Sequence, residues 1–171
     1  MNAQELRDLQ APLKARYREA PESAVITLKA KGTLGGEGIT CKIETGRALA
    51  EAGLHPAAGG DGVSLCSGDM LLEALVACAG VTLKAVATAL ELPLRGGAVT
   101  AEGDLDFRGT LGVDRSAPVG FREIRLRFDI DCPAGADQIA TLLQLTERYC
   151  VVFQTLHKGP RLAVSHHLIG R

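Results

Sequence analysis

The segment LLEALVACAGVTL, residues 71–83, decides the fold and sets one thiol, Cys78, among alanines, leucines and valines. Apolar residues recur there with the period of a helix, and from Leu75 to Leu83 the other faces are apolar or small as well. A helix that is apolar nearly all round is a buried one. We therefore predict a buried central helix over residues 69–91, ended by Pro93 and the glycines at 96 and 97.

Shorter elements surround this helix in the sequence. The N-terminal residues 3–19 have helical periodicity, although Pro12 predicts a kink or the start of a second short helix. We expect strands and one further helix in the following order: a strand over 23–32, two short strands within 38–53 that turn near Thr45-Gly46, long strands over 98–109 and 121–132, a helix over 135–149, a short turn after Cys150, and a last strand over 161–169.

The alternation in residues 121–132 shows how the predicted sheet is covered. Ile124, Leu126, Phe128 and Ile130 share one face, and charged residues occupy the other, so one face of the sheet is wet. The predicted fold class is α+β, with a mostly antiparallel sheet wrapped around the long buried helix. One sheet face and one short helix cannot cover so hydrophobic a helix, and an intertwined homodimer with this helix at its centre would.

Composition limits the functions to consider. The 171 residues suit a single domain, 1–171, and the net charge of −1 with 4% aromatic residues and no Trp argues against a nucleic-acid or membrane partner. We detect no signal peptide, and the longest apolar run, 70–83, contains Glu73 and is shorter than the roughly 20 residues of a membrane span. We therefore expect a cytoplasmic protein, where five cysteines do not form a disulfide framework.

The cysteines carry the strongest chemical signal. Cys41, Cys66 and Cys132 are interpreted as small semi-buried side chains, whereas Cys78 and Cys150 lie on or at the end of helices that should pack together. Two neighbouring thiols in a reducing compartment suggest a dithiol/disulfide couple. The adjacent histidines at 166 and 167 would point to opposite faces of a strand, so we expect no metal site.

Such a couple suits peroxide chemistry. A thiolate attacks a peroxide oxygen and becomes a sulfenic acid, which a second thiol converts to a disulfide. The first thiol needs a lowered pKa, and Cys78 lies well inside its helix, where the helix dipole is a poor source. A guanidinium would supply the effect.

Three stretches resemble the OsmC/Ohr family, the osmotically inducible and organic-hydroperoxide-resistance proteins. They are SGDMLLEALVACAGVTLKAVA with Cys78, LLQLTERYCVVFQTL with Cys150, and the TGR of Thr45-Gly46-Arg47. The resemblance covers residues 24–168 and leaves 1–20 as a helical extension.

The resemblance implies an intertwined homodimer and a thiol peroxidase for organic hydroperoxides. Cys78 would be the peroxidatic thiol and Cys150 the resolving thiol, and Arg47, supplied across the dimer, would stabilise the thiolate. No metal or organic cofactor is implied, and an external dithiol of lipoyl type would be the reductant.

The sequence also departs from the family pattern. The glutamate that orients the arginine is replaced by Gly68, and Asp69 is the nearest acid, with Glu73 one turn on. The proline that often follows the second cysteine is Val151, and a polar residue just beyond is Phe153. Two alternatives to an enzyme therefore stay open: a non-enzymatic small-molecule-binding or redox-sensing module, and a structural dimer with inert thiols.

Overall fold

The computed structural model describes residues 3–34, 41–43, 53–60, 62 and 66–167. A four-stranded antiparallel sheet in the order β2-β1-β3-β4 forms the body of the described chain. Its strands are β1 (Val25–Leu34), β2 (Cys41–Ile43), β3 (Gly96–Asp106) and β4 (Phe121–Asp131). The antiparallel sheet and its accompanying helices confirm the predicted α+β class.

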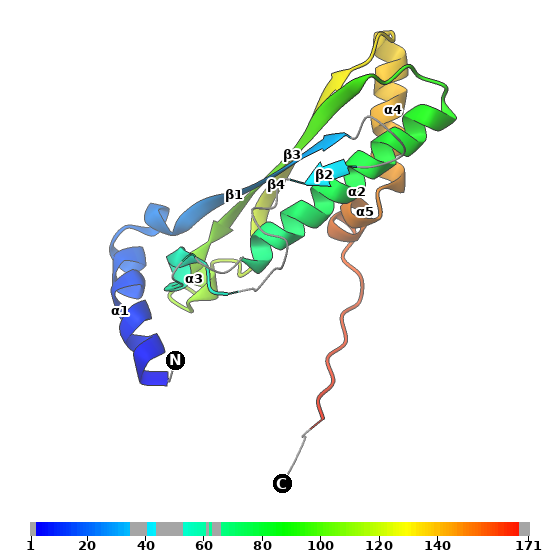
Figure 1. The fold of residues 1–171 in the computed structure, drawn as a ribbon. Coiled ribbons are helices and arrows are strands. Elements are labelled where there is room, and N and C mark those ends of the chain that lie inside the picture. The colour runs from blue at the N-terminus through cyan, green and yellow to red at the C-terminus, as the bar shows by residue number, and fades with distance from the viewer. Residues whose placement is uncertain (1–2, 35–40, 44–52, 61, 63–65, 168–171) are drawn as a thin grey trace.

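The long helix α2 (Ser67–Ala89) runs along one face of the sheet, as Figure 1 shows. Its buried side includes Leu72, Leu75, Val76 and Leu83, all nearly inaccessible to solvent. The predicted central helix is confirmed, with both ends two residues earlier than expected. By length and composition α2 could also cross a membrane, but here it packs against β1 and β3 as a core helix.

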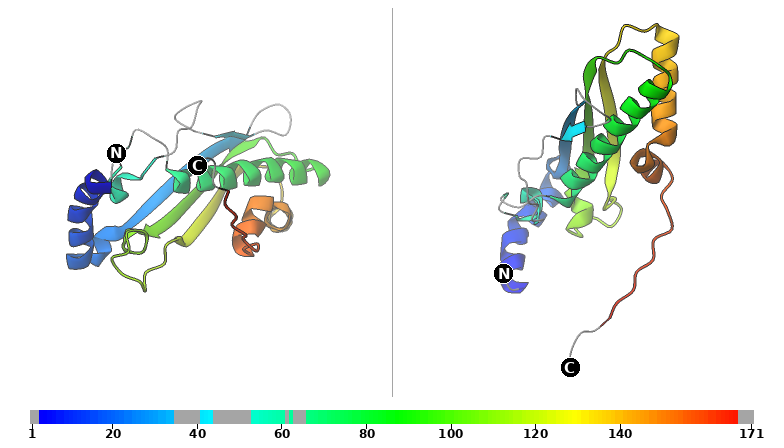
Figure 2. Two further views of the ribbon diagram at one scale, coloured as in Figure 1. Left: turned by 90° about the horizontal axis from the view of Figure 1, so that it is seen from below. Right: turned by 45° about the vertical axis from the view of Figure 1, so that its right-hand side comes forward.

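Two helices at the C-terminal end of the chain lie beside α2 on the side away from α1 (Figure 2). They are α4 (Ala136–Tyr149), close to the predicted 135–149, and α5 (Val151–His157). Sequence analysis expected only a short turn after Cys150, and this expectation was wrong. Seven residues are too few for a periodic pattern to identify a helix, and two β-branched valines open the segment.

The pleat of β3 and β4 separates a dry face from a wet one, as predicted. Val99, Ala101 and Leu105 of β3 are buried toward α2. On the opposite face Arg125 of β4 donates to Asp104 of β3 at 2.6 Å, and Thr27 of β1 donates to the same carboxylate at 2.6 Å. This bonding ties three strands together on the solvent side.

The N-terminal helix α1 (Ala3–Glu19) is a single helix that contains Pro12. A 3-10 turn, η1 (Pro21–Ala24), links it to the sheet. Tyr17 anchors it: the side chain is fully buried, and its hydroxyl donates to the carbonyl of Ala57 at 2.6 Å. Ala57 belongs to a second turn, η2 (Pro56–Ala58), which packs near the short helix α3 (Phe107–Thr110).

The chain after α5 corrects a further expectation. Residues 161–167, predicted as part of a last strand, form no strand in the described structure and run away from the body (Figure 1). Leu162 and Val164 are 84% and 98% exposed. Alternating sequence suits a segment to a sheet, but a strand forms only when an edge pairs with it.

Candidate functional site

The two thiols paired in the sequence analysis are in contact. Cys78 lies in the fourth turn of α2, and Cys150 lies at the junction where α4 ends and α5 begins. The Cys150 thiol forms a hydrogen bond with the Cys78 sulfur. Both are free thiols, as are Cys66 and Cys132.

The junction is shaped by Cys150 itself. Its extended backbone, with φ −71° and ψ 107°, turns the chain from α4 into α5. Its sulfur accepts from the Phe153 N–H at 3.5 Å, so the side chain acts as the N-cap of α5. Because this turn brings the start of α5 against α2, the first amides of α5 face Cys78.

Burial and hydrogen bonding act on Cys78 in opposite directions. Burial alone raises the pKa of the thiol, but the backbone N–H groups of Val152 and Val151 and the hydroxyl of Thr82 donate to the sulfur, as does the Cys150 thiol. Together these donors outweigh burial and hold the pKa of Cys78 below its ordinary value. Hydrogen bonds to the charged form always favour that form.

The same contact has the opposite effect on its partner. Burial and the contact with Cys78 together raise the pKa of Cys150 to about 11, although the amides of Phe153 and Val152 oppose the rise. The exposed fraction of Cys150 is only 1%. The contact therefore makes the two thiols unequal: Cys78 loses its proton more readily than Cys150.

The donors were not foreseen from the sequence, which pointed to a guanidinium as the source of the lowered pKa. Val151 had been noted as a departure from the family's proline, and a proline there would have no N–H to donate. That absent proline was a signal that the sequence contained. Thr82, one helical turn after Cys78, was a second.

The remaining predicted residues lie elsewhere or outside the described part of the chain. Arg47 lies outside the described residues. Asp69 is in the first turn of α2, nine residues before Cys78 and thus about 13 Å from it along the helix axis. Burial raises the pKa of Asp69, and the nearby His55 opposes that rise. The pKa of Glu73 is raised by burial and by the charge of Asp69.

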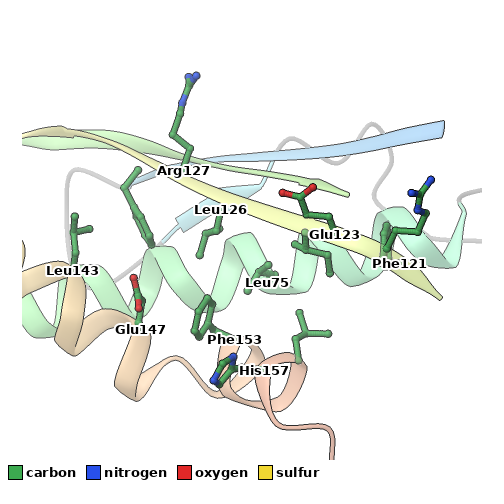
Figure 3. Close-up of a pocket in the computed structure, with 13 residues that line it drawn as sticks. Leu75, Phe121, Glu123, Leu126, Arg127, Leu143, Glu147, Phe153 and His157 are labelled. Carbon is green, nitrogen blue, oxygen red and sulfur yellow. The ribbon is translucent and has the colours of Figure 1, made fainter. Parts of the chain in front are cut away.

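A groove of about 630 Å³ opens beside the thiol pair, between β4 on one side and α4 and α5 on the other (Figure 3). Leu75 of α2 lies at its floor, and Phe153 and His157 of α5 stack at its wall with ring centroids 6.1 Å apart. Glu147 points in from α4, whereas Arg127 points away toward solvent (Figure 3). Neither sulfur lines the groove. Two residues that do line it are close to the thiols: Leu75 is one helical turn from Cys78, and the backbone N–H of Phe153 donates to the Cys150 sulfur.

The described residues show no cluster of three or more His, Cys, Asp or Glu side chains that could hold a metal ion. The thiol pair supports a chemistry of its own. A half-buried sulfur with a lowered pKa, such as that of Cys78, can act as a nucleophile and can then form a disulfide with the neighbouring Cys150 thiol.

Comparison with known proteins agrees with the fold. A solved structure of an OsmC-like hydroperoxide resistance protein from Jannaschia sp. CCS1 superposes with a TM-score of 0.60 over 86% of this chain and 95% of that chain, at 14% sequence identity. No curated protein matches the sequence. The model of the OsmC-like protein family matches residues 59–165, more than half of the chain and both cysteine motifs, and the chain therefore belongs to the OsmC-like family.

Proposed function

We propose that this protein is a thiol peroxidase that reduces organic hydroperoxides through Cys78 and Cys150. The observation that carries the proposal is the hydrogen-bonded thiol pair, in which the pKa of Cys78 is lowered and that of Cys150 is raised. The family and a structural relative described as a hydroperoxide resistance protein support it. An inert structural thiol in an apolar helix would have a raised pKa.

The proposed reaction balances in two steps. The Cys78 thiolate attacks the terminal oxygen of the hydroperoxide: an S–O bond forms, the O–O bond breaks, and the departing alkoxide takes a proton to become the alcohol. The sulfur is oxidised by two electrons to a sulfenic acid. The Cys150 thiol then attacks that sulfur, water leaves, and a disulfide forms between neighbouring sulfurs. An external dithiol restores both thiols by exchange.

Arg47 and Asp69 stay predictions from the resemblance. Arg47 would approach Cys78 from a second copy of the chain and polarise the peroxide, and Asp69 would orient it. Asp69 lies in the first turn of α2 and Cys78 near its middle, so a residue that bridges them must be long, as arginine is.

A second copy of the chain is the partner that we propose. On α2, Met70, Leu71 and Val81 are 37%, 37% and 39% exposed, so the helix is not fully covered by its own sheet. The extended segment 158–167 carries two further exposed apolar side chains, Leu162 and Val164. Both features support a homodimer in which apolar surface of each chain is covered by the other. Sedimentation of the purified chain as a monomer at micromolar concentration would rule this out.

The function is tested by consumption of cumene hydroperoxide and of a fatty-acid hydroperoxide, with dihydrolipoamide as reductant. The wild-type protein should consume both, and Cys78→Ser should consume neither. Cys66→Ser, a partly buried thiol at the start of the same helix, is the matched control and should keep full activity. Cys150→Ser should form a sulfenic acid that dimedone traps. Absence of turnover by the fully reduced wild-type protein would refute the proposal.

The groove favours a second candidate, a non-enzymatic module that binds a small apolar molecule. Its volume lies in the range of roughly 300–1,000 Å³ typical of ligand pockets, and neither sulfur lines it. Under this alternative, an apolar fluorescent probe would bind wild type and Cys78→Ser equally and no hydroperoxide would be consumed. Leu126→Arg, which places a charge in the groove, would abolish probe binding.

A further inference from the structure

The hydroxyl of Thr82 bonds a cysteine side chain one turn earlier in α2. Threonines within helices commonly donate to the backbone carbonyl four residues earlier. Thr88 of α2 does so to Lys84 at 2.8 Å, and in α4 Thr141 and Thr146 do so to Asp137 and Leu142 at 2.9 and 2.7 Å. The Thr82 hydroxyl donates to the side chain four residues earlier, which is the sulfur of Cys78.

Helix geometry explains how the hydroxyl reaches the sulfur. Residues four apart lie on one face, one above the other, and helical side chains lean toward the N-terminus of their helix. The Thr82 side chain therefore covers the level of Cys78. Both residues are partly buried, so the hydrogen bond forms at the edge of the core and a small reactant can approach the sulfur from solvent.

We propose that Thr82 is a catalytic group of the thiol site, whose hydroxyl hydrogen bond stabilises negative charge on the Cys78 sulfur and holds that sulfur in one orientation. This inference deepens the proposed function and rests on it. Thr82 belongs to the same rigid helix as the nucleophile, so its donor is in place before any substrate or partner arrives. The two amide donors come from α5, which is short and has no fully buried residue, and the remaining donor is the Cys150 thiol at its N-cap.

The test is the pH dependence of Cys78 alkylation by iodoacetamide, followed at that residue by mass spectrometry. Thr82→Val removes the hydroxyl and keeps the side-chain shape. The loss of one hydrogen-bond donor to a partly exposed thiolate should move the midpoint of the alkylation profile upward by about one pH unit. Because nucleophilicity rises with pKa, alkylation below the midpoint should slow only about threefold, and the high-pH plateau should rise about threefold.

Three variants make the result specific. Thr82→Ser keeps a hydroxyl and should restore the wild-type midpoint. Thr88→Val makes the same change six residues later in α2, where the hydroxyl donates to the carbonyl of Lys84, and should leave the midpoint unchanged. Thr82→Ala is a second hydroxyl-free variant and should shift the midpoint as Thr82→Val does, whichever of the two folds better.

The outcomes separate this inference from the proposed function. If Thr82→Val has the wild-type midpoint, or Thr88→Val shifts it equally, the role of Thr82 is refuted even when the wild-type protein consumes hydroperoxide. If the midpoint shifts and the wild-type protein consumes no hydroperoxide, the proposed peroxidase fails and the role of Thr82 in catalysis fails with it. Support requires both the shift and a pH–rate profile of hydroperoxide consumption that moves upward with it.

Discussion

Val151→Pro removes one hydrogen-bond donor from Cys78 and changes little else. The Val151 N–H donates to the Cys78 sulfur, and proline has no N–H. Proline is well tolerated at the first position of a helix, which Val151 occupies in α5. The residue before a proline must be extended, and Cys150 already is, with ψ 107°. The Val151 side chain is 70% exposed, so little packing is lost.

The size of the effect follows from the kind of bond removed. A hydrogen bond to a charged group contributes about 1.5–3 kcal/mol, which corresponds to roughly one to two pKa units. Cys78 is only partly buried, so water can replace part of the lost bond, and we take the lower end. We expect the pKa of Cys78 to rise by about one unit in Val151→Pro.

The thiolate absorbance near 240 nm, titrated with pH against Cys78→Ser as a blank, measures this pKa. Val151→Ala is the matched control, because it loses the same exposed side chain and keeps the amide; it should titrate like the wild-type protein. Equal pKa values for Val151→Pro and Val151→Ala would show that the amide does not stabilise the thiolate. Circular dichroism should report unchanged helix content in both variants.

Three other predictions concern the partner thiol and the fold. In Cys78→Ser, Cys150 should resist iodoacetamide at pH 8, because its burial, the largest cause of its raised pKa, is unchanged; rapid labelling would contradict this. Asp104→Asn should lower the free energy of unfolding at pH 7, and the variant should lose less stability than the wild-type protein when the pH is lowered. Hydrogen bonds from Arg125 and Thr27 hold the pKa of Asp104 at about 2, so its contribution is present above the ordinary value of 3.8 and is lost as pH falls through about 2; urea unfolding at several pH values tests this. Leu142→Ala, at a fully buried site, should cost about 2–5 kcal/mol in the free energy of unfolding, whereas the exposed Gln144→Ala should cost little.

The parts of the fold that were predictable are those with long, regular patterns. Twenty-three residues of α2 repeat the helical period, and Pro93 with its following glycines ends it unambiguously. The alternation of β4 is equally clear over eleven residues. Both patterns reflect burial on one side, which is a property of the residue types alone.

The parts that escaped prediction depend on contacts between distant segments. Nothing local in VVFQTLH, residues 151–157, distinguishes a helix from a turn, and it is the Cys150 sulfur that caps it. The last segment shows the reverse case. Residues 161–167 have the alternation of a strand, but pairing is not a local property, and the described chain leaves them extended and exposed.

The site shows most clearly why residue types alone were insufficient. From the sequence, the apolar surroundings of Cys78 argued for a raised pKa unless a positive charge opposed it. In the structure the opposing groups are neutral donors of the same chain: two amides, a hydroxyl and a thiol. Residue types do not indicate which backbone amides will donate to the sulfur, and it is the turn at Cys150 that brings these two amides to it.

This arrangement also distinguishes the two cysteines without reference to any relative. The shared hydrogen bond lowers the pKa of Cys78 and raises that of Cys150, so the contact itself makes the pair unequal. The sulfur with the lowered pKa belongs to the partly exposed Cys78, which a reactant can reach, whereas the sulfur with the raised pKa belongs to the buried Cys150. A nucleophile must meet its substrate, whereas a resolving thiol needs to meet only the oxidised partner. Exposure and the directions of the two pKa shifts therefore support our proposal that Cys78 is the attacking thiol, and an arginine from a second chain would add to the stabilisation that the chain's own donors give its thiolate.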